Sequence, residues 1–408
     1  MTSPLLAAIA ACILGAGGEY TEPETLAYPH VDYLQKGDSL YGYDFNQAVT
    51  DLMLHNGKLW MGYGDATKNM GSSMPIEFRY YSVSGTDTTM SSAEVIANGQ
   101  GAAQRSPFDS GEEQIDAYRL IDGTLWVAGI DSNNPDEEWT QAKKSNPKLI
   151  EGNVFRLESD GRWTKFRSIP GGEHVHDVAG FDGDIYAVGS GANDRAEWEK
   201  GIVHRYLWRS TDNGKTFKTV FRAPTPDTGK SDTRFRRLLA VGKTLYAFGY
   251  VNPMKVKLPQ KAAHIAWRND EAAPVTSAML GDLASLIVTR TWNLDADRGI
   301  VIARDTNTTA PTRAFVVDEK GAVELKGWAK MRVVDMAPGN TKGEYYVLAG
   351  SGGTNENFDV YRVNAASLDA PAHVLDARNI RMESIACWNG DLYLGTTDGQ
   401  LLRSFHTK

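Results

Sequence analysis

A short pattern that returns along the chain limits the possible folds more than any other feature. Each copy is an alternating strand, a turn with Gly, and an apolar-aromatic strand that in most copies ends in Gly. The clear copies are 51–62, 118–129, 178–189, 238–249 and 385–395, and weaker ones occur at 299–303 and 343–350. Although 408 residues would suggest two or three domains, a repeated unit predicts one repeat architecture.

The turns of these copies are typical of β-hairpins. Asn56-Gly57, Asp122-Gly123, Asp182-Gly183 and Asn389-Gly390 combine residues that accept the positive φ of a tight primed turn. Further strand-like segments follow at 153–157, 163–166, 206–209 and 217–221. We therefore predict an all-β fold, a seven-bladed β-propeller of four-stranded antiparallel blades. Because two copies are weak, six and eight blades remain alternatives.

The two ends of the chain lead to separate expectations. Residues 19–408 should form a single propeller domain whose last blade, 385–405, is completed by a strand from within 20–43, since closure removes an exposed sheet edge. Residues 1–18 form an apolar N-terminal segment, in which Ile9-Ala10-Ala11-Cys12 resembles a bacterial lipobox but no Lys or Arg precedes it. An extracytoplasmic protein, secreted or lipid-anchored, is one hypothesis. An uncleaved, packed N-terminus, as in a virion component, is the other.

The composition excludes several classes of protein. With 43 Lys plus Arg against 51 Asp plus Glu, the net charge is −8, and no basic stretch supplies the field that nucleic acid requires. The 2 cysteines exclude a disulfide scaffold and a cysteine-based zinc module. Membrane contact is expected only through an N-terminal lipid anchor, and the oligomeric state stays open.

One segment resembles a known repeat. Ser210-Thr211-Asp212-Asn213-Gly214-Lys215-Thr216-Phe217 is similar to the Asp-box, or bacterial neuraminidase repeat, of the sialidase-like propellers. That resemblance implies a turn between the two outer strands of a blade and structural roles for Asp212 and Phe217. The box also occurs in receptors that are not enzymes, so it implies fold more than activity. Sialidase chemistry is disfavoured, because the expected Arg-Ile-Pro segment is interrupted in Arg167-Ser168-Ile169-Pro170.

The register of the repeats points to one mouth of the central channel. Aligned copies place Thr50, Asp116, His176, Arg236 and Glu383 at one position of the inner strand, and Ala48, Gln114, His174, Arg234 and Arg381 two residues earlier. These two positions share a strand face, so polar side chains should converge there. Long loops follow the second strands at 63–75, 131–149, 190–201 and 250–261, which would place them around the same mouth.

These observations predict carbohydrate recognition. Exposed aromatic rings stack on sugar rings while polar groups bind hydroxyls. The expected substrate-binding residues are Tyr63, Asp65, Gln114, Asp116, Asp131, Trp198, Arg381 and Glu383. A channel lined with polar residues only because it is wet is the alternative.

The segment Glu173-His174-Val175-His176-Asp177 carries the most specific chemical signal. Its two imidazoles could be ordinary polar residues, ligands of a divalent cation shared with Asp116 or Asp177, or acid/base groups beside Arg234 and Arg236. Guanidinium groups can neutralise a uronate carboxylate, so that a His or Tyr base removes the C5 proton and elimination cleaves the glycosidic link. The predicted catalytic residues are His174, His176, Arg234, Arg236 and Tyr250, with Tyr250 as the acid and no cofactor required.

This set of His, Tyr and Arg in a seven-bladed propeller resembles the ulvan lyases, which attack an acidic algal polysaccharide. The resemblance is architectural and implies a lyase more than a glycoside hydrolase. The alternative function is a glycan- or partner-binding propeller without catalysis, such as a cell-surface or virion attachment module.

Overall fold

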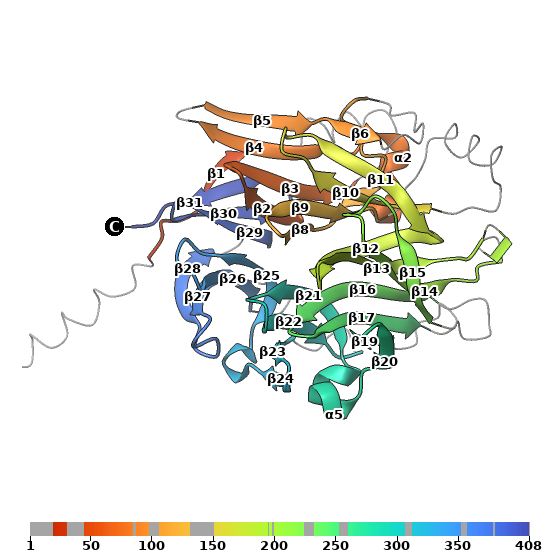
Figure 1. Ribbon diagram of the computed structural model, residues 1–408. Coiled ribbons are helices and arrows are strands. Elements are labelled where there is room, and N and C mark those ends of the chain that lie inside the picture. The colour runs from red at the N-terminus through yellow and green to blue at the C-terminus, as the bar shows by residue number, and fades with distance from the viewer. Residues whose placement is uncertain are drawn as a thin grey trace, which may run out of the picture.

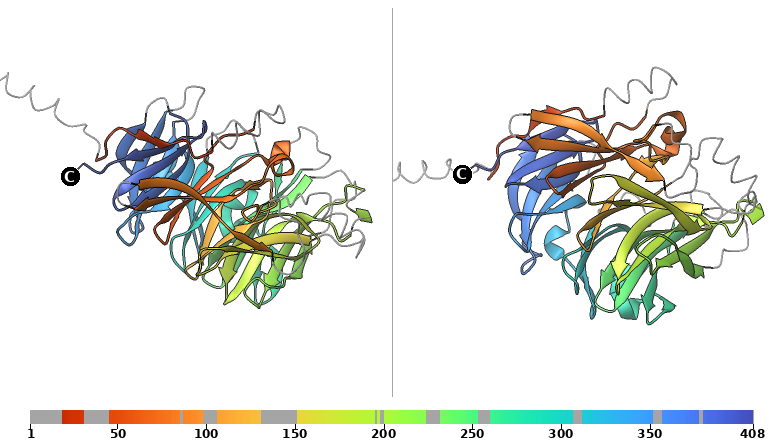
Figure 2. Two further views of the ribbon diagram at one scale, coloured as in Figure 1. Left: turned by 90° about the horizontal axis from the view of Figure 1, so that it is seen from above. Right: turned by 45° about the horizontal axis from the view of Figure 1, so that its top comes forward.

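Seven β-sheets of four or five strands surround a common axis in the computed structural model (Figures 1 and 2). The structure describes residues 19–30, 45–84, 87–97, 106–130, 151–194, 196–197, 200–223, 232–252, 260–306, 312–351, 357–377 and 380–407. The sheets are mostly antiparallel, and the first strand of each repeat lies innermost. The predicted seven-bladed β-propeller is confirmed, and the alternatives of six and eight blades are excluded.

Blades 1 to 3 come from the first half of the chain. Blade 1 contains β2 (Asp51–His55), β3 (Lys58–Gly64), β4 (Phe78–Ser84) and β5 (Asp87–Ala93), and the short β7 (Gln114–Ile115) pairs with β3. Blade 2 contains β8 (Tyr118–Ile121), β9 (Thr124–Ala128), β10 (Glu151–Leu157), β11 (Trp163–Pro170) and the parallel edge strand β6 (Val95–Ala97). Blade 3 contains β12 (Gly172–Phe181), β13 (Asp184–Gly191), β14 (His204–Ser210) and β15 (Lys218–Ala223).

Blades 4 to 7 continue the ring. Blade 4 contains β16 (Asp232–Val241), β17 (Thr244–Asn252), β19 (Ile265–Arg268), β20 (Glu271–Pro274) and β18 (Lys261–Ala262). Blade 5 contains β21 (Ile287–Asn293), β22 (Gly299–Arg304), β23 (Arg313–Asp318) and β24 (Gly321–Glu324). Blade 6 contains β25 (Arg332–Pro338), β26 (Glu344–Gly350), β27 (Phe358–Asn364) and β28 (Ala372–Ala377). Blade 7 contains β29 (Met382–Trp388), β30 (Asp391–Thr396), β31 (Leu401–Ser404) and β1 (Glu24–Ala27).

Helices are few and short in the part of the chain that the structure describes. The α-helices are α2 (Met70–Ser73) and α5 (Ser277–Leu280), and the 3-10 helices are η1 (Ala66–Lys68), η3 (Gly281–Ser285) and η4 (Lys326–Trp328). Across the described ranges, no helix is long and apolar enough to cross a membrane.

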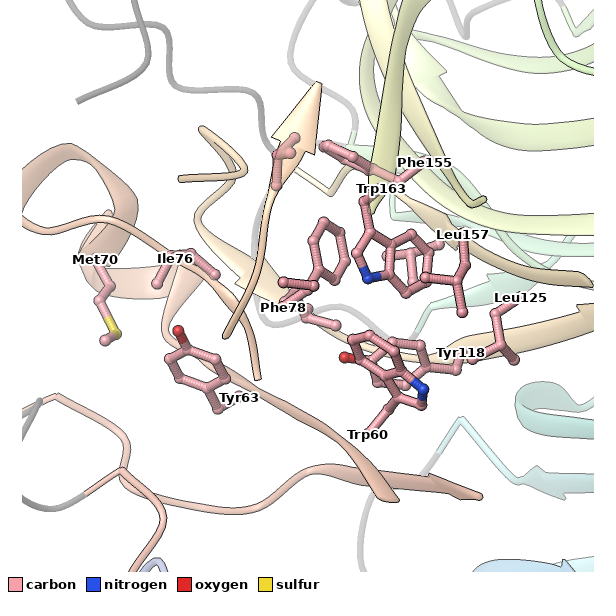
Figure 3. Close-up of a cluster of buried hydrophobic side chains, with 14 of the residues drawn as sticks. Trp60, Tyr63, Met70, Ile76, Phe78, Tyr118, Leu125, Phe155, Leu157 and Trp163 are labelled. Carbon is pink, nitrogen blue, oxygen red and sulfur yellow. The ribbon is translucent and has the colours of Figure 1, made fainter. Parts of the chain in front are cut away.

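Hydrophobic packing closes the ring between the blades. Among the described residues, seven clusters of buried apolar side chains each join two neighbouring sheets. Figure 3 shows the cluster between blades 1 and 2, where the rings of Phe78 and Trp163 stack with centroids 4.2 Å apart and Trp60 meets Trp163 edge-on. Because every blade packs against two others, the apolar faces of all seven sheets are covered.

The last junction joins the two ends of the chain. β1 pairs antiparallel with β31, so a strand from the N-terminal region completes blade 7 (Figure 1). The Tyr20 hydroxyl donates to the hydroxyl of Tyr346 at 2.7 Å, and Glu19 pairs with Arg362 at 2.6 Å, which ties the same segment to blade 6. β31 therefore has no free edge. The N-terminal segment and the last two blades stabilise one another.

The turn at 210–217 connects the two outer strands of blade 3, β14 and β15. The Asp212 carboxylate accepts hydrogen bonds from the Thr216 amide at 2.9 Å and from the Thr216 hydroxyl at 2.6 Å. The ring of Phe217 is buried between blades 2 and 3. Asp212 and Phe217 thus act locally in the turn and its packing.

Candidate functional site

The seven inner strands begin at one end of the channel, called here the upper mouth, and the second strands of the blades return to it. Five consecutive inner strands, those of blades 3 to 7, carry a β-bulge near this end. The bulged residues are His176, Arg236, Thr289, Val334 and Glu383. A bulge turns side chains out of the ordinary alternation, so this shared irregularity directs the residues of the upper mouth.

The glycine that ends most copies of the repeat explains how the bulge is accommodated. A Cβ at Gly189 would overlap the carbonyl oxygen of His174, and one at Gly249 would overlap that of Arg234. The inner strand therefore passes too close to the second strand for any larger residue. The close approach of the two strands thus explains both the glycine at the end of the repeat and the bulge at the upper mouth.

His174 and His176 lie side by side at the start of β12. Their rings stack with centroids 5.9 Å apart and an interplanar angle of 14°. His176 is 3% exposed, and neither of its ring nitrogens has a hydrogen-bond partner among the described residues. Burial, followed by the charges of Arg236 and Arg234, lowers the pKa of His176 well below its usual value of 6.5. The imidazole is therefore neutral at pH 7 and retains a free lone pair.

Asp116 faces the arginines of the opposite blades. Both Nη atoms of Arg237 lie 3.4 Å from its Oδ2. Burial opposes ionisation of Asp116, but the guanidinium groups of Arg237, Arg290 and Arg236 outweigh it and lower the pKa of the carboxyl. Asp116 is thus a carboxylate, and its main partner is a residue of this protein.

Two arginines cross the channel: Arg237 is buried, and the Arg119 side chain is 21% exposed. Arg237 reaches from blade 4 to Asp116 before blade 2 and to the carbonyl oxygen of Thr289 in blade 5, at 3.0 Å. Arg119 reaches from blade 2 to Asp177 in blade 3 and to the carbonyl oxygen of Thr291 in blade 5, at 2.9 Å. A cavity of about 270 Å³ lies at the other end and is lined in part by Arg119.

Three aspartates link the inner strands of neighbouring blades in the same way. Each accepts an amide N–H of the next blade at 2.8 Å: Asp51 from Tyr118, Asp177 from Leu238, and Asp335 from Ile385. Burial raises the pKa of Asp51 to about 6 and that of Asp335 to about 8. The negative charge of Asp51 also contributes to the raised pKa of Asp335. These carboxyls join blades and are poorly placed to hold a metal ion.

The repeat pattern does not indicate a role for five charged residues of the channel, Arg119, Arg237, Arg290, Asp51 and Asp335. Asp51 and Arg119 lie within clear copies of the repeat but below the two positions that were aligned. Asp335 and Arg290 lie in the blades with the weakest copies, where the repeat gave no register. Arg237 could have been found, because it follows the aligned Arg236 directly.

Several expected substrate-binding residues are engaged in the fold. Tyr63 is 0% exposed, lies in the cluster of Figure 3 and accepts a hydrogen bond from the Glu77 amide at 2.8 Å. Asp65 is buried, caps η1 and accepts the amides of Thr67 and Lys68. Neither residue offers a free face to a sugar ring.

The remaining expected residues divide between the upper mouth and segments that lie outside the described residues. Tyr250 is 6% exposed and lies directly opposite Arg234 on the paired strand, while Gln114 accepts the Ala66 amide at 3.0 Å. Glu383 is at the bulge of blade 7, and Arg381 is exposed just before β29. Asp131 and Trp198 belong to the segments outside the described ranges.

The two imidazoles were one hypothesis for a cation site. Within the described ranges, no group of three or more His, Cys, Asp or Glu side chains is arranged to hold a metal ion. Asp177, considered as a third ligand, accepts two hydrogen bonds from Arg119 and the amides of Val178 and Leu238. Its oxygens are therefore already in use.

Comparison with known proteins yields similar folds but no family. No family model and no curated protein matches the sequence. YCF48 bound to a D1 peptide is similar with a TM-score of 0.45 and 11% identity, over 90% of this chain and 95% of that chain. The α-L-arabinanase of Penicillium chrysogenum complexed with arabinobiose has a TM-score of 0.40 and 12% identity, over 86% and 99%. A prolyl endopeptidase has a TM-score of 0.47 and 13% identity, over 96% of this chain and 50% of that chain.

Proposed function

We propose that the upper mouth binds an acidic polysaccharide through a uronate carboxylate and cleaves it by β-elimination. The observation that carries this proposal is the state of His176, which is buried, neutral and without a hydrogen-bond partner among the described residues. Buried polar groups are normally satisfied, and exceptions concentrate where a ligand or a reaction uses them. A base that must accept a proton needs the free lone pair that this imidazole has.

The charges around His176 favour an anionic ligand. Arg234 and Arg236 both act electrostatically on the imidazole. Arg236 makes no side-chain hydrogen bond within the described residues, whereas Arg237 beside it makes four. A free guanidinium group binds carboxylates in bidentate fashion. This local group can attract an acidic chain even though the protein has a net charge of −8.

The reaction assigns one role to each group. The ligand carboxylate pairs with Arg236, which makes the proton on C5 more acidic. His176 accepts this proton, the electron pair forms the C4–C5 double bond, and the C4–O bond breaks. Tyr250, opposite Arg234, donates a proton to the leaving oxygen. The products are an unsaturated uronate and a chain with a new hydroxyl, so no water is consumed.

The test is incubation with uronate-rich polysaccharides, followed by the ultraviolet absorbance of the unsaturated product. We expect turnover by the wild type and a loss of about 10²- to 10⁴-fold in kcat for His176→Ala. Arg236→Ala should raise KM as well, because it removes the carboxylate partner. Binding without any product in the wild type would contradict elimination and leave a glycan-binding propeller. Absence of both binding and product would contradict the whole proposal.

A further inference from the structure

Arg237 connects three parts of the channel through one guanidinium group. It is 3% exposed, and its Nε donates to the carbonyl oxygen of Thr289 at 3.0 Å. Its Nη1 donates to the carbonyl oxygen of Arg236 at 3.0 Å, and Nη1 and Nη2 both face Asp116 at 3.4 Å. Burial lowers the pKa of Arg237 to about 10, which still leaves it protonated at pH 7.

The contact with Arg236 has a consequence for the ligand. Arg236 is the bulged residue of β16, and a bulge sets the direction of its side chain. Because Arg237 donates a hydrogen bond to the carbonyl oxygen of Arg236, the peptide group at the bulge is restricted to one orientation. The guanidinium group of Arg236, which has no hydrogen-bond partner in the described ranges, then extends from a rigid base.

We infer that Asp116 and Arg237 are positioning residues, in which Asp116 holds Arg237 and Arg237 holds the Arg236 bulge beside His176. A ligand carboxylate then meets Arg236 and not Arg237, whose three nitrogens already donate to Thr289, Arg236 and Asp116. This inference rests on the proposed function for the identity of the ligand, although the contacts themselves do not depend on it. It also changes the expected role of Asp116 from substrate binding to support.

Electrostatics agree with this arrangement. The groups that act on His176 are Arg236, Arg234, His174 and Arg237, and all of them lower its pKa. Glu173 lies on the far side of His174, with its Oε2 3.6 Å from the Nδ1 of that ring. Loss of the Arg237 charge would remove one of the cations that lower the pKa of His176 and would leave Arg290 and Arg236 as the remaining cations that act on Asp116, so the pKa of His176 would rise.

The experiment compares Arg237→Lys, Arg237→Met and Asp116→Asn with Arg209→Lys as the control. Arg209 pairs with Asp184 in the outer part of blade 3, away from the channel. Affinity for a galacturonate trimer is measured by calorimetry. The titration of His176 is followed by NMR of the labelled imidazole, assigned with His176→Ala.

For Arg237→Lys we expect an affinity about tenfold lower with a nearly unchanged His176 titration, since Lys keeps the charge but lacks the planar fork. Arg237→Met and Asp116→Asn should weaken binding too, and Arg237→Met should shift the His176 titration upward toward its usual value. The control should behave as the wild type. Wild-type affinity in folded Arg237→Lys and Asp116→Asn would overturn the inference.

Two safeguards keep the outcomes distinct. If Arg237→Lys fails to fold by circular dichroism, Asp116→Asn carries the binding test, because it removes the charge that holds Arg237 while keeping the size of the side chain. If the wild type does not bind the trimer, the proposed function fails. The inference about Arg237 is then decided by the His176 titration alone, and an unchanged titration in Arg237→Met contradicts it.

Discussion

The guanidinium group of Arg119 forms two parallel hydrogen bonds with the carboxylate of Asp177, with Nε–Oδ1 and Nη2–Oδ2 distances of 2.7 Å. The same carboxylate accepts the amides of Val178 and Leu238, and Arg119 also donates to Thr291. One ion pair therefore links the inner strands of blades 2, 3, 4 and 5. Asp177 is 2% exposed and the Arg119 side chain 21%, so this link is mostly shielded from solvent.

Asp177→Ala should destabilise the fold by about 3 kcal/mol, because it leaves the largely buried guanidinium group of Arg119 without its counter-ion and two amides without an acceptor. Urea unfolding measures this loss. The control is Asp160→Ala, which removes an exposed pair with Arg162 and should leave the unfolding midpoint unchanged. Equal midpoints for the two variants would show that the channel pair does not hold the blades together.

Stability should fall as the pH rises from about 4 to about 8. Asp51 and Asp335 have folded-state pKa values of about 6 and about 8, both above the ordinary value of 3.8. The folded protein thus binds these protons more tightly than the unfolded chain. The resulting stability is complete at low pH and is lost as the pH passes each folded-state value.

The variant Asp51→Asn tests whether Asp51 and Asp335 cause this pH dependence of stability. Its amide oxygen can still accept the Tyr118 amide, but no charge remains opposite Asp335. The thermal midpoint of the variant should depend less on pH and exceed that of the wild type near pH 8. A variant with the same slope as the wild type would assign the pH dependence to other groups.

Much of the fold could be predicted because the hairpin turns repeat. Asn56, Asp122, Asp182 and Asn389 all have the positive φ that their Asn-Gly and Asp-Gly pairs suggested. The sequence repeat is weaker in blades 5 and 6 because their inner hairpins use longer loops, 294–298 and 339–343. These loops contain no Asn-Gly or Asp-Gly pair. Their strands still form, since apolar packing between blades does not require a particular turn.

The site was predicted less completely, and the reason is geometric. Strand alternation indicated that His174 and His176 share a face, and their rings do stack. It could not indicate the bulges, which depend on contact with the neighbouring strand, nor that Arg237 reaches Asp116 from another blade. Tyr63 shows the opposite error, because an aromatic residue before a long loop resembles a sugar platform but is buried here.

The activity proposed for the upper mouth should persist below the pH at which an ordinary histidine becomes charged. His176 must be neutral to accept a proton, and burial together with Arg236 and Arg234 lowers its pKa. The acid limb of kcat/KM should therefore lie below about pH 6.5. Arg234→Gln should move this limb upward. If the acid limb of wild-type kcat/KM lay at or above the ordinary histidine pKa of about 6.5, His176 would be excluded as the base.

Removal of residues 1–30 should abolish cooperative unfolding of the whole ring. The deletion removes β1 from the edge of β31 and the contacts of Glu19 and Tyr20 with blade 6. Calorimetry should show a broader transition at lower temperature. Removal of residues 1–18 alone is the control and should leave the transition as in the wild type. An unchanged transition in the longer deletion would show that closure by β1 contributes little.

Gly189→Ala should disturb the upper mouth selectively. Its new methyl group would overlap the carbonyl oxygen of His174, so the start of β12 must move at a cost of about 1–3 kcal/mol. Gly183→Ala is the matched control in the same hairpin, where the methyl group meets open space and only the φ of +80° is strained. Both variants should lose stability in urea, but only Gly189→Ala should alter the imidazole NMR signals of His174 and His176. Signals unchanged in Gly189→Ala would mean that the glycine does not control the bulge.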